Sequence, residues 1–511
     1  MASARAHDRL HDLTTIASVS ENDAFAGLEP AAVWTRFAEL TRIPRPSQHE
    51  ELARAYVLDW AERHGLETDV DSAGNTLVRV GASTGRERAR PVVLQSHLDM
   101  VCERDPDSPF DPQEGRIHVL RQDDWLFAEG TTLGADNGIG VAAAMAVAED
   151  AELVHGPLEL LFTVSEEQGL TGAKGLEPAL VRSRLLLNLD GTSDVALTIG
   201  CAGSTHTFIR VPLHPEPLPH TWKGLAVTLD GARGGHSGGD IARGRVNAIK
   251  ALGWILAAAS RTAQLRLVSL DGGVSRNAIP RQARAIVAIA ESSEAAFREA
   301  VAIELSAIRD RYSGTDDAVA VSVERAEVLE VGGLEASSRA LDLLAVIPTG
   351  VVVTSAAAPG SVETSTSLNV VRTEDGVLTL ASMTRSSSAS ALEGVVASLV
   401  AAARLGGATI EVVRSYPPWQ PNPQSPLLAV ARRTFERLFD FVPVLDVVHG
   451  GLECAVIGEK LPEVDMLAIG PTIEGPHAPG ERLGIASTQR FYGLLGALLD
   501  DLARQKPNGP S

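Results

Sequence analysis

The stretch Leu94-Gln-Ser-His-Leu-Asp-Met100 is the one around which this chain is organised. The apolar run at residues 91–94 is typical of a buried β-strand, and a polar cluster with His97 and Asp99 follows it directly. In an open α/β sheet, the carboxyl ends of the strands form the crevice in which ligands bind. The stretch therefore predicts a sheet whose edge carries functional side chains.

Two further apolar runs end in the same way. Residues 158–164 stop at the acidic pair Glu166 and Glu167, and residues 185–189 stop at Asp190. A capped strand end with a solvated acid explains each cluster when it is taken alone. Three strand ends that deliver His, Glu and Asp to one edge favour a metal site instead.

Composition limits the classes of protein that fit. The 511 residues are enough for two or three domains, and the net charge of −20 argues against binding to nucleic acid or to an anionic membrane. The three cysteines are widely spaced, so no disulfide framework is expected and the reducing cytoplasm fits. The sequence also shows no secretory signal and no run of 18 apolar residues, so we expect no transmembrane helix.

The order of patterns along the chain predicts a split α/β domain with an insert. Residues 1–26 are weakly patterned, after which strands and helices alternate up to residue 205 and predict a mostly parallel central sheet. Residues 206–390 alternate like an antiparallel sheet with helices on one face, which predicts an inserted α+β domain. Residues 391–511 are expected to complete the first domain.

The polar residues at the predicted edge suit a hydrolytic site with two metal ions. Such a site requires several oxygen and nitrogen ligands, one bridging group, and open positions for water and substrate. Asp136 lies in a Gly-Ala-Asp-Asn-Gly turn, and its two oxygens could bridge the ions. The five candidate ligands are His97, Asp136, Glu167, Asp190 and His477.

Two nearby acids are expected to act without binding metal. One member of the pair Glu166 and Glu167 would be a ligand, while the other stays free as a general base. Asp99 lies two residues after His97, on the same side of an extended chain, and suits the carboxylate that orients the imidazole. Each position also has a purely structural explanation. The acidic pair could lie at a helix N-terminus, where the helix dipole stabilises it, Asp136 could belong to a turn, and His477 could be a surface loop residue.

Several longer motifs occur along the chain, in order from about residue 30 to residue 500. They are Ser-His-Leu-Asp-Met, Gly-Thr-Thr-Leu-Gly-Ala-Asp-Asn-Gly-Ile-Gly, Thr-Val-Ser-Glu-Glu, Gly-Gly-His-Ser-Gly-Gly-Asp, Arg-Asn-Ala-Ile-Pro-Arg, His-Gly-Gly-Leu-Glu-Cys and Gly-Pro-Thr-Ile-Glu-Gly-Pro-His. Together they resemble the di-zinc aminoacylase/carboxypeptidase-like metallopeptidases, and within these most of all the aminoacyl-histidine dipeptidases (Xaa-His dipeptidases of the peptidase D type).

The resemblance implies a role for each candidate residue. It makes Asp136 the bridging ligand, with a cis bond to Asn137, and the other four candidates terminal ligands. It also implies Glu166 as general base and Asp99 as the partner that orients a ligand. The inserted domain would be a lid that supplies His236 to polarise the scissile carbonyl and Arg385 to grip the substrate carboxylate. Further implied substrate contacts are Asn277 and, for the free amine, Glu453.

The sequence departs from the usual family pattern at three places, none of which removes a ligand. Asp240 stands where Glu is usual, Gly450 where Ala is usual, and Ala478 where Ser is usual. These differences bear on which dipeptide is preferred rather than on the metal site.

We therefore expect a cytoplasmic, metal-dependent dipeptidase that hydrolyses Xaa-His-type or other unblocked dipeptides with a metal-activated water. Its cofactors would be two divalent ions, expected to be Zn²⁺, with Mn²⁺ or Co²⁺ as alternatives. Its partner would be a small dipeptide, and a homodimer is left open. One alternative is a deacylase that acts on N-acyl amino acids with the same metal centre. The other is a non-enzymatic metal- or peptide-binding protein, which retention of Glu166 and of every ligand disfavours.

Overall fold

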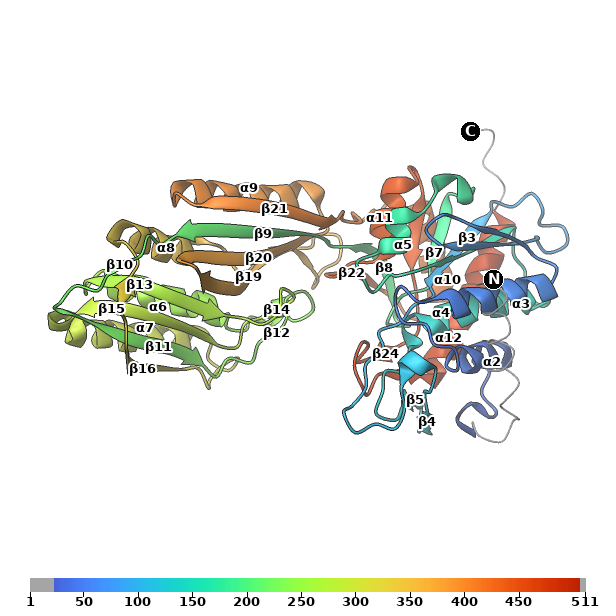
Figure 1. Ribbon diagram of the computed structural model, residues 1–511. Helices are drawn as coiled ribbons and strands as arrows, with labels where there is room; N and C mark the ends of the chain where they lie inside the picture. The colour runs from blue at the N-terminus through green and yellow to red at the C-terminus, as the bar shows by residue number, and fades with distance from the viewer. Residues whose placement is uncertain (1–22, 506–511) are drawn as a thin grey trace. The chain divides into compact units, whose positions relative to one another are not determined.

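The computed structural model describes residues 23–505 and divides the chain into two compact units. Of the described residues, the first unit comprises 23–200, 421–446 and 452–505, and the second comprises 201–420 and 447–451. Most of the weakly patterned segment predicted at residues 1–26 lies outside the described residues. Figure 1 shows that segments near both ends of the chain, blue and red, build the first unit together.

The first unit contains a mixed sheet with a parallel centre. Its strand order is β1-β2-β6-β3-β7-β23-β8-β22, and the four neighbours β6, β3, β7 and β23 run parallel. The central strands are buried along their whole length, as expected for a sheet covered by helices. The strands are β1 (Glu67–Val70), β2 (Thr76–Val80), β3 (Val92–His97), β6 (Leu158–Thr163), β7 (Leu185–Asn188), β8 (Ala196–Cys201), β22 (Val444–Val448) and β23 (Asp465–Ala468).

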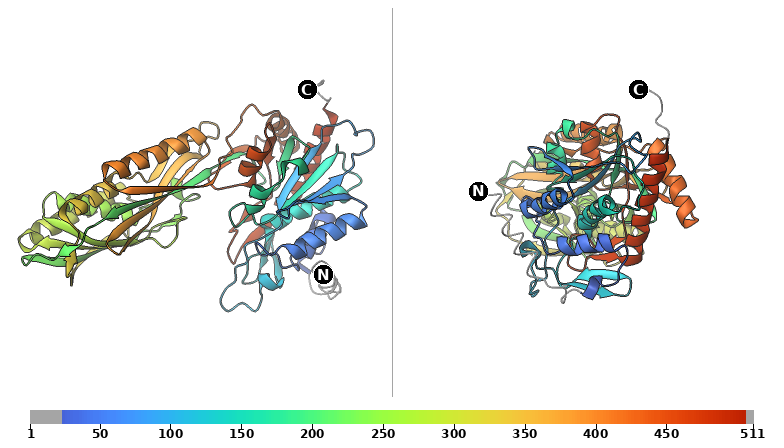
Figure 2. Two further views of the ribbon diagram at one scale, coloured as in Figure 1. Left: turned by 45° about the horizontal axis from the view of Figure 1, so that its top comes forward. Right: turned by 90° about the vertical axis from the view of Figure 1, so that its right-hand side faces the viewer.

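Helices and a small second sheet complete this unit. Helix α4 packs on β3 and α10 packs on β23, so residues from both ends of the chain cover the same sheet (Figure 2). The helices are α2 (Ala31–Leu40), α3 (Glu51–Arg63), α4 (Ala135–Glu149), α5 (Thr171–Gly175), α10 (Pro426–Phe439), α11 (Glu453–Lys460) and α12 (Ile485–Arg504). The small sheet is formed by β4 (Val119–Gln122), β5 (Trp125–Ala128), β24 (Ile473–Glu474) and β25 (Arg482–Gly484).

The second unit is an antiparallel sheet whose helices share one core. Buried residues of all four helices and of the strands form one cluster, so the helices cover the same face of the sheet (Figure 1). The helices are α6 (Ala248–Ser260), α7 (Glu294–Arg311), α8 (Leu334–Val346) and α9 (Ala389–Leu405). The main strands are β9 (Gly203–Pro212), β11 (Trp222–Asp230), β13 (Leu265–Gly272), β15 (Ala283–Ala290), β16 (Ala320–Ala326), β18 (Gly350–Thr354), β19 (Val362–Glu374), β20 (Val377–Ser386) and β21 (Thr409–Tyr416). The short strand pairs are β10 (Glu216–Pro217) with β17 (Glu330–Val331), and β12 (Gly235–His236) with β14 (Ala278–Ile279).

The fold class is confirmed, but the second domain boundary is corrected. The first crossing falls between residues 200 and 201, close to the predicted residue 205, whereas the second falls between residues 420 and 421 rather than at residue 390. The reason is that β21 pairs with β9 along its length and α9 packs on that same sheet. This long-range pairing leaves no local mark in the sequence, so the segment after residue 390 resembled a return to the first domain.

Helix α6 begins at Ala248, where the Asn247 side chain caps it by accepting a hydrogen bond from the Lys250 N–H (3.0 Å). Within the described chain, we find no helix with both the length and the apolar surface required to cross a bilayer.

Candidate active site

The three predicted strand ends meet at one edge of the first unit's sheet. Strand β3 ends at His97 and lies between β6 and β7, its parallel neighbours. Glu166 and Glu167 follow the end of β6, and Asp190 follows the end of β7. The order of strands therefore brings together groups that are far apart in the sequence.

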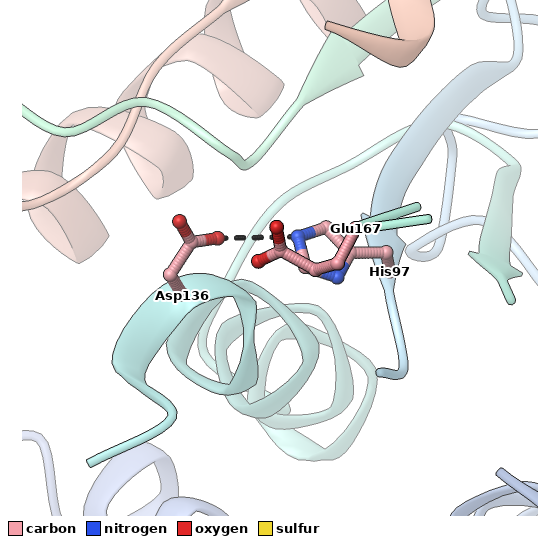
Figure 3. A group of neighbouring side chains, drawn as sticks. All are labelled: His97, Asp136 and Glu167. Atoms are coloured by element: carbon pink, nitrogen blue, oxygen red, sulfur yellow. Dashed lines mark hydrogen bonds and ion pairs between the residues drawn. The ribbon is translucent and has the colours of Figure 1, made fainter. Parts of the chain in front are cut away.

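Asp136 faces this edge from the first turn of α4. The backbone is non-helical at Asp136 and Asn137, and the peptide bond between them is cis, as the family resemblance implied. His97, Asp136 and Glu167 each present a ligand atom, and the three atoms lie within 4.8 Å of one another (Figure 3). The structure thus builds a group of side chains that could hold a metal ion.

The two oxygens of Asp136 face different histidines. Its Oδ1 lies 3.1 Å from His97 Nε2, and its Oδ2 lies 3.3 Å from His477 Nε2. Each histidine has a second carboxylate beside it, since Asp190 Oδ1 lies 3.6 Å from His97 Nε2 and Glu167 Oε1 lies 2.9 Å from His477 Nε2. The five predicted ligands therefore form two histidine–carboxylate pairs on either side of Asp136.

Asp99 connects the first pair to the acidic segment after β6. The His97 Nδ1 atom lies 3.3 Å from Asp99 Oδ1, which leaves Nε2 facing the ligand cluster. The Asp99 carboxylate also accepts hydrogen bonds from the backbone N–H groups of Glu166 (3.0 Å) and Glu167 (3.1 Å). One buried acid thus orients the imidazole and fixes the acidic pair, whereas the sequence predicted only the first of these contacts.

Two buried charged residues that the sequence analysis missed hold the loops of the site. The Arg45 guanidinium donates to the carbonyls of Leu98 (3.0 Å), Asp99 (2.9 Å) and Gly134 (2.5 Å). A Cβ at Gly134 would lie 2.6 Å from the Arg45 Nη2 atom, so a residue without a side chain is required there. The sequence indicated only a helix break around Arg45, because its partners lie more than 50 positions away.

Glu481 performs the corresponding task for the Asp136 loop. Its carboxylate accepts from the backbone N–H groups of Leu133 (2.8 Å), Gly134 (2.9 Å) and Asp136 (3.2 Å). Since Glu481 follows His477 by four residues, it ties the two loops that supply these ligands. A lone Glu in a Gly-rich loop carries no local signal for such a role.

The charges within the cluster strongly perturb one another. Burial and the neighbouring Asp136 charge raise the pKa of Asp190 to about 8, although His97 opposes this. Hydrogen bonds to Asp136 and Glu167 raise the pKa of His477 to about 11. Burial lowers the pKa of His97, but Asp190 and Asp136 outweigh burial and hold it well above its usual value. The cluster therefore has an excess of negative charge that bound cations would neutralise.

Glu166 differs from Glu167 in its electrostatics. Burial, together with repulsion from Glu167 and Asp190, raises the pKa of Glu166 well above its usual range, although His97 opposes this. Repulsion within this cluster favours a proton on Glu166, as required of a group that exchanges protons during a reaction.

In the second unit, two polar side chains and one backbone carbonyl meet around Gly238. A Cβ there would lie 2.6 Å from the His449 carbonyl oxygen, 3.1 Å from His236 Cε1 and 3.3 Å from Arg385 Nε. The Arg385 side chain is buried and donates to the Tyr416 hydroxyl (3.2 Å), but it forms no ion pair with any acid in residues 23–505. Its buried Nε also has no hydrogen-bond partner there. A buried cation without an anion is costly, so this unit is built to receive a negative group.

His449 is a third residue whose role was not predicted from the sequence. Its Nε2 lies 2.7 Å from the Ser365 hydroxyl. Burial lowers the pKa of the His449 imidazole to about 4, the Arg385 charge adds to this, and the Val362 carbonyl opposes it. The imidazole is therefore neutral beside the Arg385 guanidinium.

The remaining two predicted substrate residues have different surroundings. Asn277 is exposed and lines a cavity of 890 Å³ together with His236, both within the second unit. Glu453, in contrast, is only 1% exposed and accepts hydrogen bonds from Gln95 (2.6 Å) and Thr163 (2.5 Å) in the first unit. Burial raises its pKa to about 7. These surroundings show no group that contacts a substrate amine, and that contact of Glu453 stays a prediction.

The donor set suits divalent metal ions. Two imidazoles and several carboxylates are the ligands that Zn²⁺ and similar ions bind. The Glu167 Oε1 atom is buried and lacks a well-aligned hydrogen bond within the described chain, although His477 Nε2 lies 2.9 Å away. Both atoms can therefore face a shared ion, and the raised pKa values of Asp190 and His477 reflect the negative charge of the cluster, which bound ions would neutralise.

Comparison with known proteins identifies the family. The profile of Peptidase family M20/M25/M40 matches residues 93–501. This chain belongs to that family. The chain is 38% identical to the cytosol non-specific dipeptidase of Escherichia coli over 477 residues, which cover 93% of this chain and 98% of the relative.

Solved structures of this family have the same fold. The aminoacylhistidine dipeptidase of Vibrio alginolyticus is 36% identical to this chain, with a TM-score of 0.86, and the match covers 93% of this chain and 97% of that one. An aminopeptidase from Bacillus cereus matches at 16% identity with a TM-score of 0.55, covering 93% of this chain and 100% of that one. At that identity the similarity concerns the fold alone.

Proposed function

We propose that this family member is a metal-dependent dipeptidase with two divalent ions, and that His97, Asp136, Glu167, Asp190 and His477 hold them. The observation that carries the proposal is the position of Asp136, whose two oxygens face two separate histidine–carboxylate pairs. The high identity to a dipeptidase over nearly the whole chain supports the same activity.

In this mechanism the residues of the first unit position and move protons. When bound, the two ions would activate a water molecule as the nucleophile and polarise the peptide carbonyl. Glu166 takes the proton of that water and delivers it to the nitrogen of the leaving amine. Asp99 keeps the His97 imidazole and the backbone of Glu166 and Glu167 in position during these steps.

The second unit supplies substrate recognition as a lid domain. The unpaired, buried guanidinium of Arg385 binds the C-terminal carboxylate of the dipeptide through charge-assisted hydrogen bonds. His236 donates to the oxygen of the scissile carbonyl. Asn277 directly precedes β14, the strand that pairs with the His236 strand β12, and supplies a further substrate contact. A longer peptide would carry its carboxylate beyond Arg385, which accounts for a preference for dipeptides.

The finer assignments follow from the ligand set and from the relatives. Zn²⁺ suits two imidazoles with carboxylates, and Mn²⁺ or Co²⁺ could replace it. The names of the relatives support unblocked dipeptides, including those with a C-terminal His, as substrates and the cytoplasm as the location.

A substrate and metal panel tests the proposal. Purified protein is stripped of metal, reloaded with Zn²⁺, Mn²⁺ or Co²⁺, and assayed on free dipeptides, N-acetylated dipeptides, N-acetyl amino acids and tripeptides. The proposal expects metal-dependent cleavage of free dipeptides, slower cleavage of tripeptides, and little activity on N-blocked compounds. Preferential cleavage of N-acetyl amino acids would replace it with a deacylase, and metal binding without any hydrolysis would exclude an enzyme of this kind.

A further inference from the structure

A chain of buried amides links Glu453 to the segment that carries Asp190. Gln95 Nε2 donates to Glu453 Oε2 (2.6 Å), and Gln95 Oε1 accepts from Asn188 Nδ2 (2.7 Å). Asn188 Oδ1 then accepts from the backbone N–H of Asp190 (3.2 Å). All of these groups belong to the first unit, and Gln95 and Asn188 each precede a candidate ligand, His97 or Asp190, by two residues.

The direction of this chain is fixed by its end. Burial raises the pKa of Glu453 to about 7, and above that pH the ionised carboxylate only accepts hydrogen bonds, so it forces the Gln95 side chain to present its NH₂ group to it. The opposite end of the Gln95 amide must then accept, which turns the NH₂ group of Asn188 toward Gln95. The Asn188 oxygen is thereby left to hold the Asp190 N–H in an Asx-type turn.

The side chains of the chain are shielded from water and substrate. Gln95 is 0% exposed, and Asn188 and Glu453 are each 1% exposed. Thr163, also buried, donates its hydroxyl to Glu453 Oε2 (2.5 Å) and so supports the same end. Glu453 Oε1 is buried without a partner in the described chain, so the hydrogen bonds to Glu453 Oε2 are the ones that hold this carboxylate. Hydrogen bonds within a buried polar network restrict its members to a single arrangement.

We propose that Glu453, Gln95 and Asn188 form a positioning relay that holds Asp190 in place for the metal ion shared with His97. The inference rests on the proposed function, because it assumes that Asp190 and His97 bind one of the two ions. The relay reaches only this side of the cluster, whereas Glu167 and His477 are held by other contacts. Its loss should therefore affect one metal site and spare the other.

Metal titration of the apo full-length protein tests the relay. Zn²⁺ affinities are measured by competition with a chelator, and Co²⁺ absorption spectra report each site separately. The wild type should bind two ions. Gln95→Glu, which keeps the shape but removes the NH₂ donor, should weaken one ion by about 10–100-fold and leave the other unchanged. Asn188→Leu should do the same if Gln95→Glu fails to fold.

A charge swap separates positioning from general damage. The double variant Gln95→Glu with Glu453→Gln reverses donor and acceptor across the same contact, and it should restore the weakened site to within a few-fold of wild type. Glu159→Gln is the control, because Glu159 is buried at the other end of β6 and binds the backbone of Arg182 and Ser183. It should lower the melting temperature without changing either metal affinity.

Three results would overturn the relay. They are unchanged affinities in Gln95→Glu, equal weakening of both ions, and a folded double variant without recovery. A wild type that binds two ions while these results hold would leave the proposed function intact. A wild type that binds fewer than two ions would overturn both proposals.

Discussion

Glu166 and Glu167 are adjacent in sequence, yet their side chains have different neighbours. Glu167 Oε1 lies beside His477, whereas the pKa of Glu166 is raised by burial and by the surrounding acids. We expect Glu166→Gln to keep both metal ions and to lose turnover by at least about 10²–10⁴-fold, because the amide cannot take a proton from water. Metal analysis and steady-state kinetics on the same preparation check this. Glu167→Gln is the matched control and should lose metal; the reverse outcome would exchange the two roles.

Arg385 provides a test of carboxylate recognition at a single side chain. Its guanidinium is buried without an acidic partner in the described chain, so a substrate carboxylate is expected to complete the pair. Arg385→Ala should raise KM for a free dipeptide strongly and matter much less for the same dipeptide with an amidated C-terminus. His236→Ala should depress turnover of both substrates. Equal sensitivity of both substrates to Arg385→Ala would leave Arg385 a structural residue.

His449 makes the second unit sensitive to acid. Its pKa falls from the ordinary 6.5 to about 4 in the folded protein, so the unfolded chain binds a proton first as the pH falls. The contribution of His449 to the free energy of unfolding is therefore complete above pH 6.5. It decreases by at most about 3 kcal/mol as the pH falls from 6.5 to 4. Urea unfolding at pH 7.5 and pH 4.5 should show a smaller loss for His449→Gln than for the wild type. An identical loss in both proteins would contradict this origin.

At the residue scale, the sequence predicted those members of the site that lie in short local motifs. His97, Asp136 and Asp190 each follow a recognisable strand or turn signal, and the structure brings them together. Arg45 and Glu481 could not be predicted, because their roles depend on backbone groups far away in the sequence. Glu453 was assigned to a substrate because the motif around it is recognisable, whereas its burial depends on the fold.

At the scale of elements, the positions of buried strands were predictable from local patterns, whereas the pairing of an edge strand was not. The apolar runs at β6 and β7 stand where their patterns indicate. Strand β21 alternates exposed and half-buried residues and lies at the edge of its sheet. Its membership in the second unit depends on pairing with β9, about 200 residues earlier, and this is why the domain boundary was misplaced.

Lys250 shows how one side chain can complete a neighbouring helix. Its buried ammonium group donates to the carbonyls of Leu344 (2.8 Å), Ala345 (2.6 Å) and Ile347 (2.5 Å) at the end of α8. Carbonyls in the last turn of a helix have no partners within the helix, and a cation there also complements the helix dipole. Lys250→Met should therefore destabilise the second unit by about 3 kcal/mol.

Chemical denaturation checks the Lys250 prediction against a matched lysine. Lys223 belongs to the same unit and forms a partly exposed ion pair with Glu294, so Lys223→Met should cost less than about 1 kcal/mol. Similar losses in the free energy of unfolding of the two variants would show that the Lys250 cap contributes no more to stability than a partly exposed ion pair.

At the scale of the whole molecule, the metal ligands and the stability of the second unit are separate. All five proposed ligands belong to the first unit, while the second unit has its own core built from four helices and its sheet. A ligand that binds only the folded form of one unit raises the stability of that unit by mass action. Metal binding and the Lys250 contact should therefore act on different unfolding transitions.

Differential scanning calorimetry with and without metal tests this separation. Zn²⁺ at about 100 times its dissociation constant adds about 2.7 kcal/mol to the folded first unit, so its transition should rise by about 5–10 °C relative to protein in excess chelator. The second unit's transition should not move with metal. Lys250→Met should identify the second unit's transition, because it lowers the temperature of that transition alone. Asp136→Asn should abolish the metal-dependent rise of the first unit's transition and leave the second unit's transition unchanged. A single transition that shifts with both perturbations would mean that the two units unfold as one, and that metal binding stabilises the entire chain.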